Sequence, residues 1–272
     1  MNKFKNKFPR MKPVIGMVHL PPLPGAPMYD PKFSWNSIIE FALEDAFCLI
    51  EGGVDGIQVE NQFDNPYLLP ENIGPETVAF VTSVSCAIRQ KFPTIPLGVH
   101  IMLNGCIHSL AVAKAANADW IRAYNVANVY ISNSGYISAS GPELMRYRNA
   151  IDAKNIMVFG DFQVKHGSHA ITADRSIEEK AHDAENSLTD AVIITGAATG
   201  VAPDAELLKR IKKHVSVPIL IGSGLSIDNL GELLPFADGA IVGSTFKEKC
   251  KINLPVDFNS VSNFVKLAHS LN

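Results

Sequence analysis

Short apolar segments alternate with longer amphipathic segments along almost the whole chain. Eight of the short segments are rich in β-branched residues and have the length of buried strands. They lie at residues 14–18, 56–59, 96–101, 120–123, 156–162, 191–194, 218–221 and 240–242. Strand-sized segments that alternate with helical ones are typical of repeated βα units and a parallel sheet.

The intervening segments carry helical spacing and helical end signals. Residues 38–50 place apolar side chains on one face, and Gly52 and Gly53 follow them, which predicts the end of a helix. Two further helices are predicted to begin at Pro75 and Pro203, because the first turn of a helix tolerates proline.

The number of βα units favours one architecture. Eight units in 272 residues give 34 residues per unit, close to the roughly 250-residue size of a (β/α)8 barrel. An open doubly wound sheet would need a glycine-rich dinucleotide turn after its first strand, but residues 19–27 read HLPPLPGAP. We therefore predict a single α/β (β/α)8 TIM barrel over residues 13–272, preceded by a flexible basic tail over residues 1–12.

Composition and charge exclude several classes of protein. The chain is 47% hydrophobic and 19% charged, unlike a disordered protein. Lys and Arg number 24 against 27 Asp and Glu, so no basic excess exists to bind a nucleic-acid backbone. No apolar segment approaches the roughly 18 residues of a membrane-spanning helix. We predict neither a nucleic-acid partner nor a membrane span.

Cysteine usage and the basic segment bear on location. The four cysteines are scattered without a CxxC pair, which favours free thiols in a reducing compartment. Residues 1–12 carry five basic side chains but lack the apolar core of a secretory signal. We expect a cytoplasmic protein, with an organelle matrix as the alternative if this segment is the remnant of a transit peptide.

Polar side chains collect where the predicted strands end, and in such barrels the chemistry lies at the C-terminal strand ends. We expect five of these residues to be catalytic, namely Asp161, Glu60, His19, Lys165 and His166. We expect seven others to bind substrate, namely Asn61, His100, Asn104, Arg122, Asn125, Gln163 and Thr195.

Small residues follow the last two predicted strands. Glycine lets backbone N–H groups approach an anion, and the N-terminus of a following helix adds a favourable potential. Two ordinary tight turns are the alternative. The predicted phosphate-binding residues are Gly222, Ser223, Gly224, Gly243, Ser244 and Thr245.

Two of the catalytic candidates leave alternative roles open. Asp161, Gln163 and Lys165 would share one face if the fifth strand stays regular that far. Asp161 would then serve as general acid or base, or it would pair with a neighbouring Arg such as Arg122 in a structural role. Lys165 would stabilise an oxyanion together with Arg122, or form a Schiff base with a carbonyl substrate.

No metal or cofactor is predicted firmly. Several candidates have the donor atoms that suit a divalent ion, but they are not arranged in the HxH or HExxH spacing of a metal motif. Without a GxGxxG motif, NAD is disfavoured. A divalent metal and flavin phosphate remain open alternatives.

The chain resembles the BtpA/SgcQ family in nine segments, of which HLPPLPG within residues 14–27 is the most specific. The resemblance extends from about residue 12 to residue 270. It implies a ribulose-phosphate-binding-type barrel. One branch of the family is named for photosystem I biogenesis, another is associated with sugar uptake and metabolism, and no reaction is firmly attached to it. The segments are VIGMVHLPPLPGAP (14–27), ALEDA (42–46), GGVDGIQVEN (52–61), PETVA (75–79), LMRYR (144–148), VKHG (164–167), TGAATG (195–200), LIGSGL (220–225) and DGAIVGSTFK (238–247).

Two positions depart from the family pattern. The family commonly has Asn where this chain has His100, and often His where it has Gln163. Both positions fall inside the predicted pocket. We therefore take the photosystem biogenesis name to indicate common descent and not the function of this chain. The family-like site positions are His19, Glu60, Asn61, Asn104, Arg122, Asp161, Lys165, His166, Thr195, Gly222, Gly224, Gly243 and Thr245.

The sequence thus favours an enzyme that acts on a small phosphorylated, sugar-phosphate-like substrate by acid/base isomerase or lyase chemistry. The alternative is a non-catalytic assembly, biogenesis or regulatory factor that uses the barrel as a scaffold. Because the exposed helices of such barrels often pair, we also expect a homo-oligomer.

Overall fold

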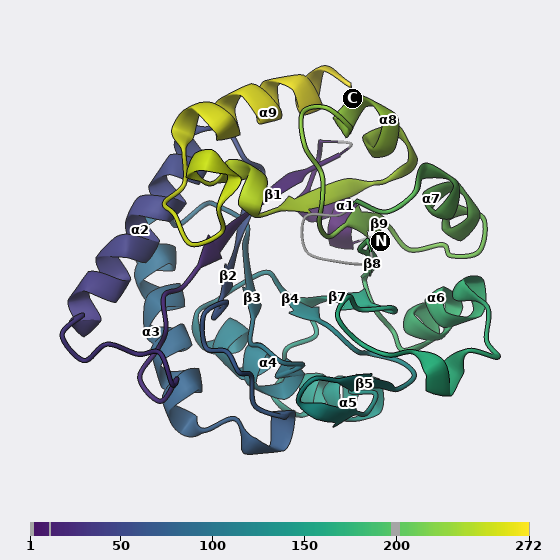
Figure 1. The fold of residues 1–272 in the computed structure, drawn as a ribbon, viewed down its shortest axis with the longest axis horizontal. Helices are drawn as coiled ribbons and strands as arrows, with labels where there is room; N and C mark the ends of the chain where they lie inside the picture. Colours follow the sequence, from purple (N-terminus) through teal and green to yellow (C-terminus); the bar gives the residue numbers. More distant parts are fainter. Residues whose placement is uncertain (1–2, 11, 197–201, 272) are drawn as a thin grey trace.

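A closed parallel barrel forms the centre of the molecule. The computed structural model describes residues 3–10, 12–196 and 202–271 (Figure 1). Within these ranges eight parallel strands close in the order β1-β10-β9-β8-β7-β4-β3-β2. The predicted (β/α)8 fold is confirmed, and each predicted strand is present with ends that shift by one residue at most. The strands are β1 (Val14–His19), β2 (Gly56–Glu60), β3 (Leu97–His100), β4 (Trp120–Ala123), β7 (Met157–Asp161), β8 (Ala191–Ile194), β9 (Ile219–Ile221) and β10 (Gly239–Val242).

The helices form an outer ring around these strands (Figure 1). A small antiparallel hairpin, β5 (Tyr130–Ser132) and β6 (Gly135–Ile137), follows β4. No helix among the described residues is long and apolar enough to cross a membrane. The helices are α2 (Trp35–Glu51), α3 (Pro75–Lys91), α4 (Cys106–Ala115), α5 (Gly141–Ala150), α6 (Ile177–Asn186), α7 (Ala205–Lys212), α8 (Leu230–Leu233) and α9 (Phe258–Ser270).

Two of the three predicted helix ends are confirmed. Helix α2 ends at Glu51, and Gly53 takes a left-handed φ of 97° just after it. Helix α3 begins at Pro75. The prediction for Pro203 is wrong: α7 begins at Ala205, because the side chain of Asp204 accepts the Glu206 N–H and caps the helix there.

The barrel interior is packed with large side chains. Trp120 on β4 is fully buried, and its indole N–H donates to Gln58 Oε1 at 3.0 Å. A Cβ at Gly98 on β3 would lie 2.1 Å from the Trp120 ring, so glycine is required for this close approach. Side chains that fill a barrel in this way make it a core and not a pore.

The N-terminal segment closes the bottom of the barrel. A flexible tail is expected over residues 1–12, but Lys3–Lys7 form α1, which lies near the middle of the ring in Figure 1. Phe4 packs against Phe159 with ring centroids 5.7 Å apart, and Phe8 packs against Trp120 at the same distance. Two aromatic side chains in a basic segment are too weak a periodic signal to predict burial.

Four aspartates precede alternate strands and bind the neighbouring strand. Each carboxylate accepts a backbone N–H from the first or second residue of that strand at 2.9 or 3.0 Å. The interaction fixes the register of one strand against the next. The pairs are Asp55 with Val14, Asp119 with Leu97, Asp190 with Val158, and Asp238 with Ile219.

Basic side chains of the N-terminal segment reach three of these aspartates. Lys3 lies 3.3 Å from Asp190, and Lys7 lies 2.5 Å from Asp119. Arg10 lies 3.5 Å from Asp55. The charges at the strand starts therefore hold the segment whose phenylalanines close the barrel.

We expect Phe8→Ala to lower the free energy of unfolding by about 3 kcal/mol, because it removes a buried ring and leaves a cavity against Trp120. Urea denaturation measures this change. The matched control is Phe47→Ala on α2, where the ring is 50% exposed and the loss should be within about 0.5 kcal/mol. Equal losses in the two variants would contradict a packed N-terminal segment.

Candidate functional site

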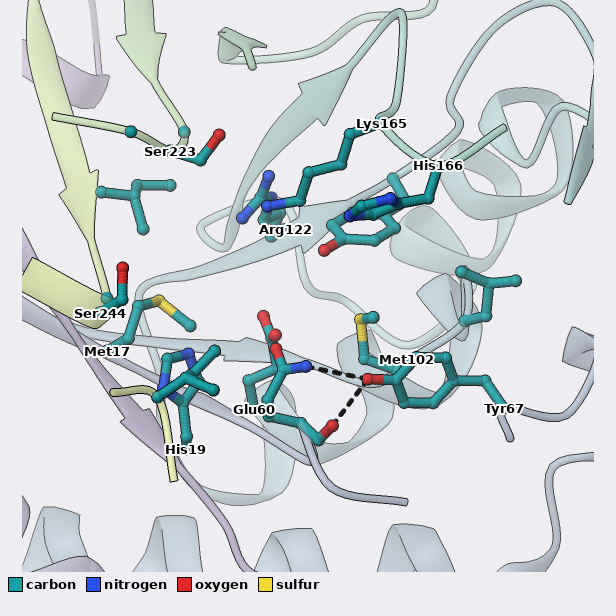
Figure 2. A pocket seen from close by; sticks show the side chains of 18 of the residues that line it. Met17, His19, Glu60, Tyr67, Met102, Arg122, Lys165, His166, Ser223 and Ser244 are labelled. Carbon is teal, nitrogen blue, oxygen red and sulfur yellow. Dashed lines mark hydrogen bonds between the residues drawn. The ribbon is translucent and has the colours of Figure 1, made fainter. Parts of the chain in front are cut away.

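A cavity of about 460 Å³ opens at the C-terminal ends of the barrel strands (Figure 2). It is lined by strand ends β1, β2 and β4, by the loops after β7, β9 and β10, and by the β5–β6 hairpin. Eleven predicted site residues line it: His19, Glu60, Arg122, Lys165, His166, Gly222, Ser223, Gly224, Gly243, Ser244 and Thr245.

Seven predicted site residues do not line this cavity. Five are buried beneath or beside it, and two line a second cavity of about 420 Å³, which shares Lys165 and His166 with the first. Residues 197–200 of the TGAATG segment lie outside the described residues. The buried five are Asn61, His100, Asn104, Asn125 and Asp161, and the other two are Gln163 and Thr195.

The loops after β9 and β10 form one cradle, which we define as residues 222–224 and 243–245. Thr245 Oγ1 donates to the Leu225 carbonyl at 2.7 Å and ties the two loops together. Within the described chain, the backbone N–H groups of Ser223, Gly224, Ser244 and Thr245 have no hydrogen-bond acceptor. Backbone N–H groups that have no other acceptor can together bind an anion.

The cradle does not use a helix N-terminus, contrary to the sequence analysis. The segment after β10 is a three-residue 3-10 helix, Ser244–Phe246, and α8 after β9 has only four residues. Gly224 takes a left-handed φ of 78°, which turns the β9 loop. The donors here are turn N–H groups rather than the end of a long helix dipole.

The cradle glycines let two polar side chains approach. A Cβ at Gly222 would lie 3.1 Å from Nη2 of Arg122 and 2.4 Å from Ile193. A Cβ at Gly243 would lie 3.0 Å from Cε1 of His19. Because glycine has no side chain, Arg122 and His19 can lie close to the backbone of the cradle.

Arg122 on β4 is held by a buried ion pair. Its Nε and Nη2 donate to the two carboxylate oxygens of Asp161 on β7, both at 2.9 Å. Burial by itself would lower the pKa of Arg122, but Asp161 outweighs it and raises that pKa. Both Asp161 oxygens are engaged, so the geometry favours the pairing role over general acid or base chemistry.

The strand that carries Asp161 does not continue to Lys165. Strand β7 ends at Asp161, and Gln163 is exposed. His166 takes a left-handed φ of 62°. The expectation that Asp161, Gln163 and Lys165 share one face is wrong, because alternation requires an extended strand.

Glu60 is held as a carboxylate. His100 Nδ1 lies 2.7 Å from Glu60 Oε2, and both side chains are buried. Burial would raise the pKa of Glu60, but His100, together with His19 and Arg122, outweighs it and lowers the pKa to about 2. His100, the departure from the family pattern, therefore positions Glu60 instead of lining the cavity.

His19 and Lys165 are both shifted toward their neutral forms. Burial lowers the pKa of His19 to about 4, so its imidazole is neutral at neutral pH. Burial and then the charge of Arg122 lower the pKa of Lys165. A neutral imidazole and a lysine with a lowered pKa thus lie in the same cavity as one carboxylate.

Apolar and aromatic residues line the other part of the cavity, and sequence reasoning missed them. Figure 2 shows Tyr67 and Met102 away from Ser223 and Ser244. Tyr67 exchanges hydrogen bonds with Gln62, at 2.6 and 3.0 Å. Tyr130 on the hairpin is buried, and its hydroxyl has no partner among the described residues. Aromatic residues in loops carry no motif that could have indicated this wall.

The metal donors predicted from sequence do not gather. In the parts of the chain that the structure describes, no three His, Cys, Asp or Glu side chains are grouped so as to hold a metal ion. His19, Glu60 and His100 are neighbours, but His100 is directed to Glu60.

Solved structures share the fold. The chain is similar to phosphoribosyl anthranilate isomerase from Thermus thermophilus, with a TM-score of 0.59, 13% identity, and 96% and 100% of the two chains covered. It is similar to tryptophan synthase subunit alpha from Legionella pneumophila, with a TM-score of 0.59, 13% identity, and 100% and 98% coverage. At this identity the likeness concerns the barrel alone.

The model of the BtpA family matches residues 10–270. An uncharacterised Archaeoglobus fulgidus protein is 39% identical, with 87% of this chain and 92% of that protein covered. An uncharacterised mitochondrial protein of Caenorhabditis elegans is 35% identical, with 95% and 93% covered. Photosystem I biogenesis protein BtpA of Synechocystis is 33% identical, with 95% and 88% covered.

We expect Asp161→Asn to lower the free energy of unfolding by about 3–5 kcal/mol, because it leaves the buried Arg122 charge uncompensated. The double variant Arg122→Met with Asp161→Leu should lose less, because neither charge remains. Urea denaturation checks both, with exposed Asp152→Asn as control. A larger loss in the double variant would contradict this account.

We expect stability to fall between pH 6.5 and about pH 4 because of His19. In this window the unfolded chain protonates the imidazole and the folded protein does not, so the unfolded state binds more protons. The loss should be about 3 kcal/mol at most, and His19→Gln should reduce it. Urea titrations across this range measure the slope, which surface variant His214→Gln should leave unchanged.

Proposed function

This chain belongs to the BtpA family, and we propose that it is an enzyme that acts on a small phosphorylated, sugar-phosphate-like substrate. The observation that carries the proposal is the cradle. Four residues whose backbone N–H groups have no acceptor in the described chain line the same cavity as Arg122 and Lys165. Neutral donors and the Arg122 guanidinium together suit a phosphate dianion.

The remaining polar groups suit proton transfer beside the bound anion. With phosphate on the cradle, Arg122 and Lys165 stabilise negative charge that develops on an oxyanion or enediolate. Neutral His19 holds or moves a proton, and the Glu60 carboxylate stabilises positive charge. Glu60 is a weak base because its pKa is about 2. Isomerase or lyase chemistry is the class that this set supports.

Asp161 has no direct part in this proposal. Its carboxylate holds Arg122 and lies outside the cavity lining. It is a positioning residue that keeps the Arg122 guanidinium beside Gly222.

The names of similar structures support the ligand class. Phosphoribosyl anthranilate isomerase and thiamine phosphate pyrophosphorylase are named for phosphorylated compounds and have this fold. The Synechocystis relative is named for photosystem I biogenesis, which supports the scaffold alternative. The mitochondrial relative supports an organelle as the alternative location. Location and oligomeric state stay predictions.

We expect inorganic phosphate and small sugar phosphates to raise the melting temperature, because a ligand that binds only the folded state stabilises it. Ser244→Asp places a negative charge in the cradle and should weaken binding about tenfold or more. Thermal shift with a ligand titration measures both effects. Ser83→Asp on α3, also partly buried, is the matched control and should bind as the wild type does.

The same titration separates an enzyme from a scaffold. Compounds that stabilise the protein are incubated with it and followed by phosphorus NMR for conversion. Conversion that is lost in Ser244→Asp supports the enzyme. If phosphate, sulfate and all of the sugar phosphates leave the melting temperature unchanged, the scaffold is favoured.

A further inference from the structure

The proposed function gives Lys165 an electrostatic role, and its position in the cavity allows a covalent one. Its side chain extends from the loop after β7 into the cavity, toward Arg122 (Figure 2). It makes no hydrogen bond or ion pair with the described residues. The buried Lys247, in contrast, is paired with Asp45. Partial burial of an unpaired lysine disfavours its charged form.

Burial and Arg122 act against the charged form of Lys165, and the carboxylates of Glu60 and Asp161 partly oppose this effect. The Lys165 side chain is partly buried and shares the cavity with the Arg122 guanidinium, which is paired with Asp161. A lysine that is desolvated and next to another cation is the kind that acts as a nucleophile toward carbonyl carbon. The lowered pKa of Lys165 agrees with this environment.

We propose that Lys165 forms an imine with the carbonyl carbon of a phosphorylated aldehyde or ketone whose phosphate lies on the cradle. The geometry that carries this is the shared cavity: the cradle, Arg122 and Lys165 line one continuous space. The imine rests on the proposed phosphate site, because the phosphate is what orients the carbonyl toward the amine.

The step needs no oxidant or reductant. The lone pair of neutral Nζ attacks the carbonyl carbon, a C–N bond forms, and the π electrons move to oxygen. Nitrogen loses one proton and that oxygen gains one, which gives a neutral carbinolamine. The nitrogen then loses its second proton, the hydroxyl leaves with a proton as water, and a C=N bond forms. One carbonyl compound and one amine thus give one imine and one water.

One side chain of the cavity can move these protons, and a second can stabilise the charge of the product. His19 is neutral, and its Nδ1 is buried without a hydrogen-bond partner among the described residues. Glu60 is a carboxylate in the same cavity and stabilises the positive charge of a protonated imine. This arrangement makes Lys165 a catalytic residue instead of a second phosphate ligand.

The test is borohydride trapping. Wild-type protein is incubated with dihydroxyacetone phosphate or glyceraldehyde phosphate, reduced with sodium borohydride, and mapped by peptide mass spectrometry. We expect a stable secondary amine on Lys165, and its loss in Lys165→Arg, which keeps the positive charge. The exposed Lys213→Arg variant is the matched control and should retain the adduct. No adduct with either compound, or an adduct spread equally over surface lysines, overturns the imine.

Two comparisons test the imine and the phosphate site independently of each other. If inorganic phosphate stabilises the protein but neither carbonyl compound is trapped, the phosphate site stands and the imine fails. If unphosphorylated dihydroxyacetone labels Lys165 as well as its phosphate does, the cradle proposal fails and the nucleophilic role of Lys165 stands. Glycerol phosphate, which lacks a carbonyl group, should protect Lys165 and leave no adduct.

Discussion

The buried ion pair between Arg122 and Asp161 is the interaction on which the site depends. It joins β4 to β7 through two hydrogen bonds of 2.9 Å. Arg122 also lies over the Tyr124 ring, 4.8 Å from its centroid, and against Gly222. A buried guanidinium is tolerated only with its partner in place. The ends of β4, β7 and β9 must therefore keep one relative position, and the cavity has a fixed positive charge.

The other charged and polar groups line separate parts of the cavity around the Arg122 guanidinium. Neutral N–H donors lie on the cradle, Lys165 is unpaired in the described chain, and Glu60 is held as an anion by His100. Tyr67 and Tyr130 line another part of the same cavity. Oriented groups in a cavity can stabilise developing charge without reorganising during a reaction.

The two ends of the barrel serve different purposes. At the bottom, aspartates before alternate strands bind neighbouring backbone N–H groups, and α1 closes the opening with Phe4 and Phe8. At the top, the backbone N–H groups of the cradle are left without such partners in the described chain. A rigid base allows the top loops to hold polar groups that contribute little to stability.

The sequence by itself determined the barrel, because strand-sized apolar segments and helix signals recur along the chain and are local properties. It also located the cradle, since glycine and hydroxyl residues directly follow β9 and β10. Only the tertiary structure decided which polar side chains enter the cavity. Asp161 is bound by Arg122 and His100 by Glu60, contacts between strands that no local pattern encodes. Lys165 reaches the cavity because β7 ends at Asp161, and Tyr130 because a hairpin folds over the mouth.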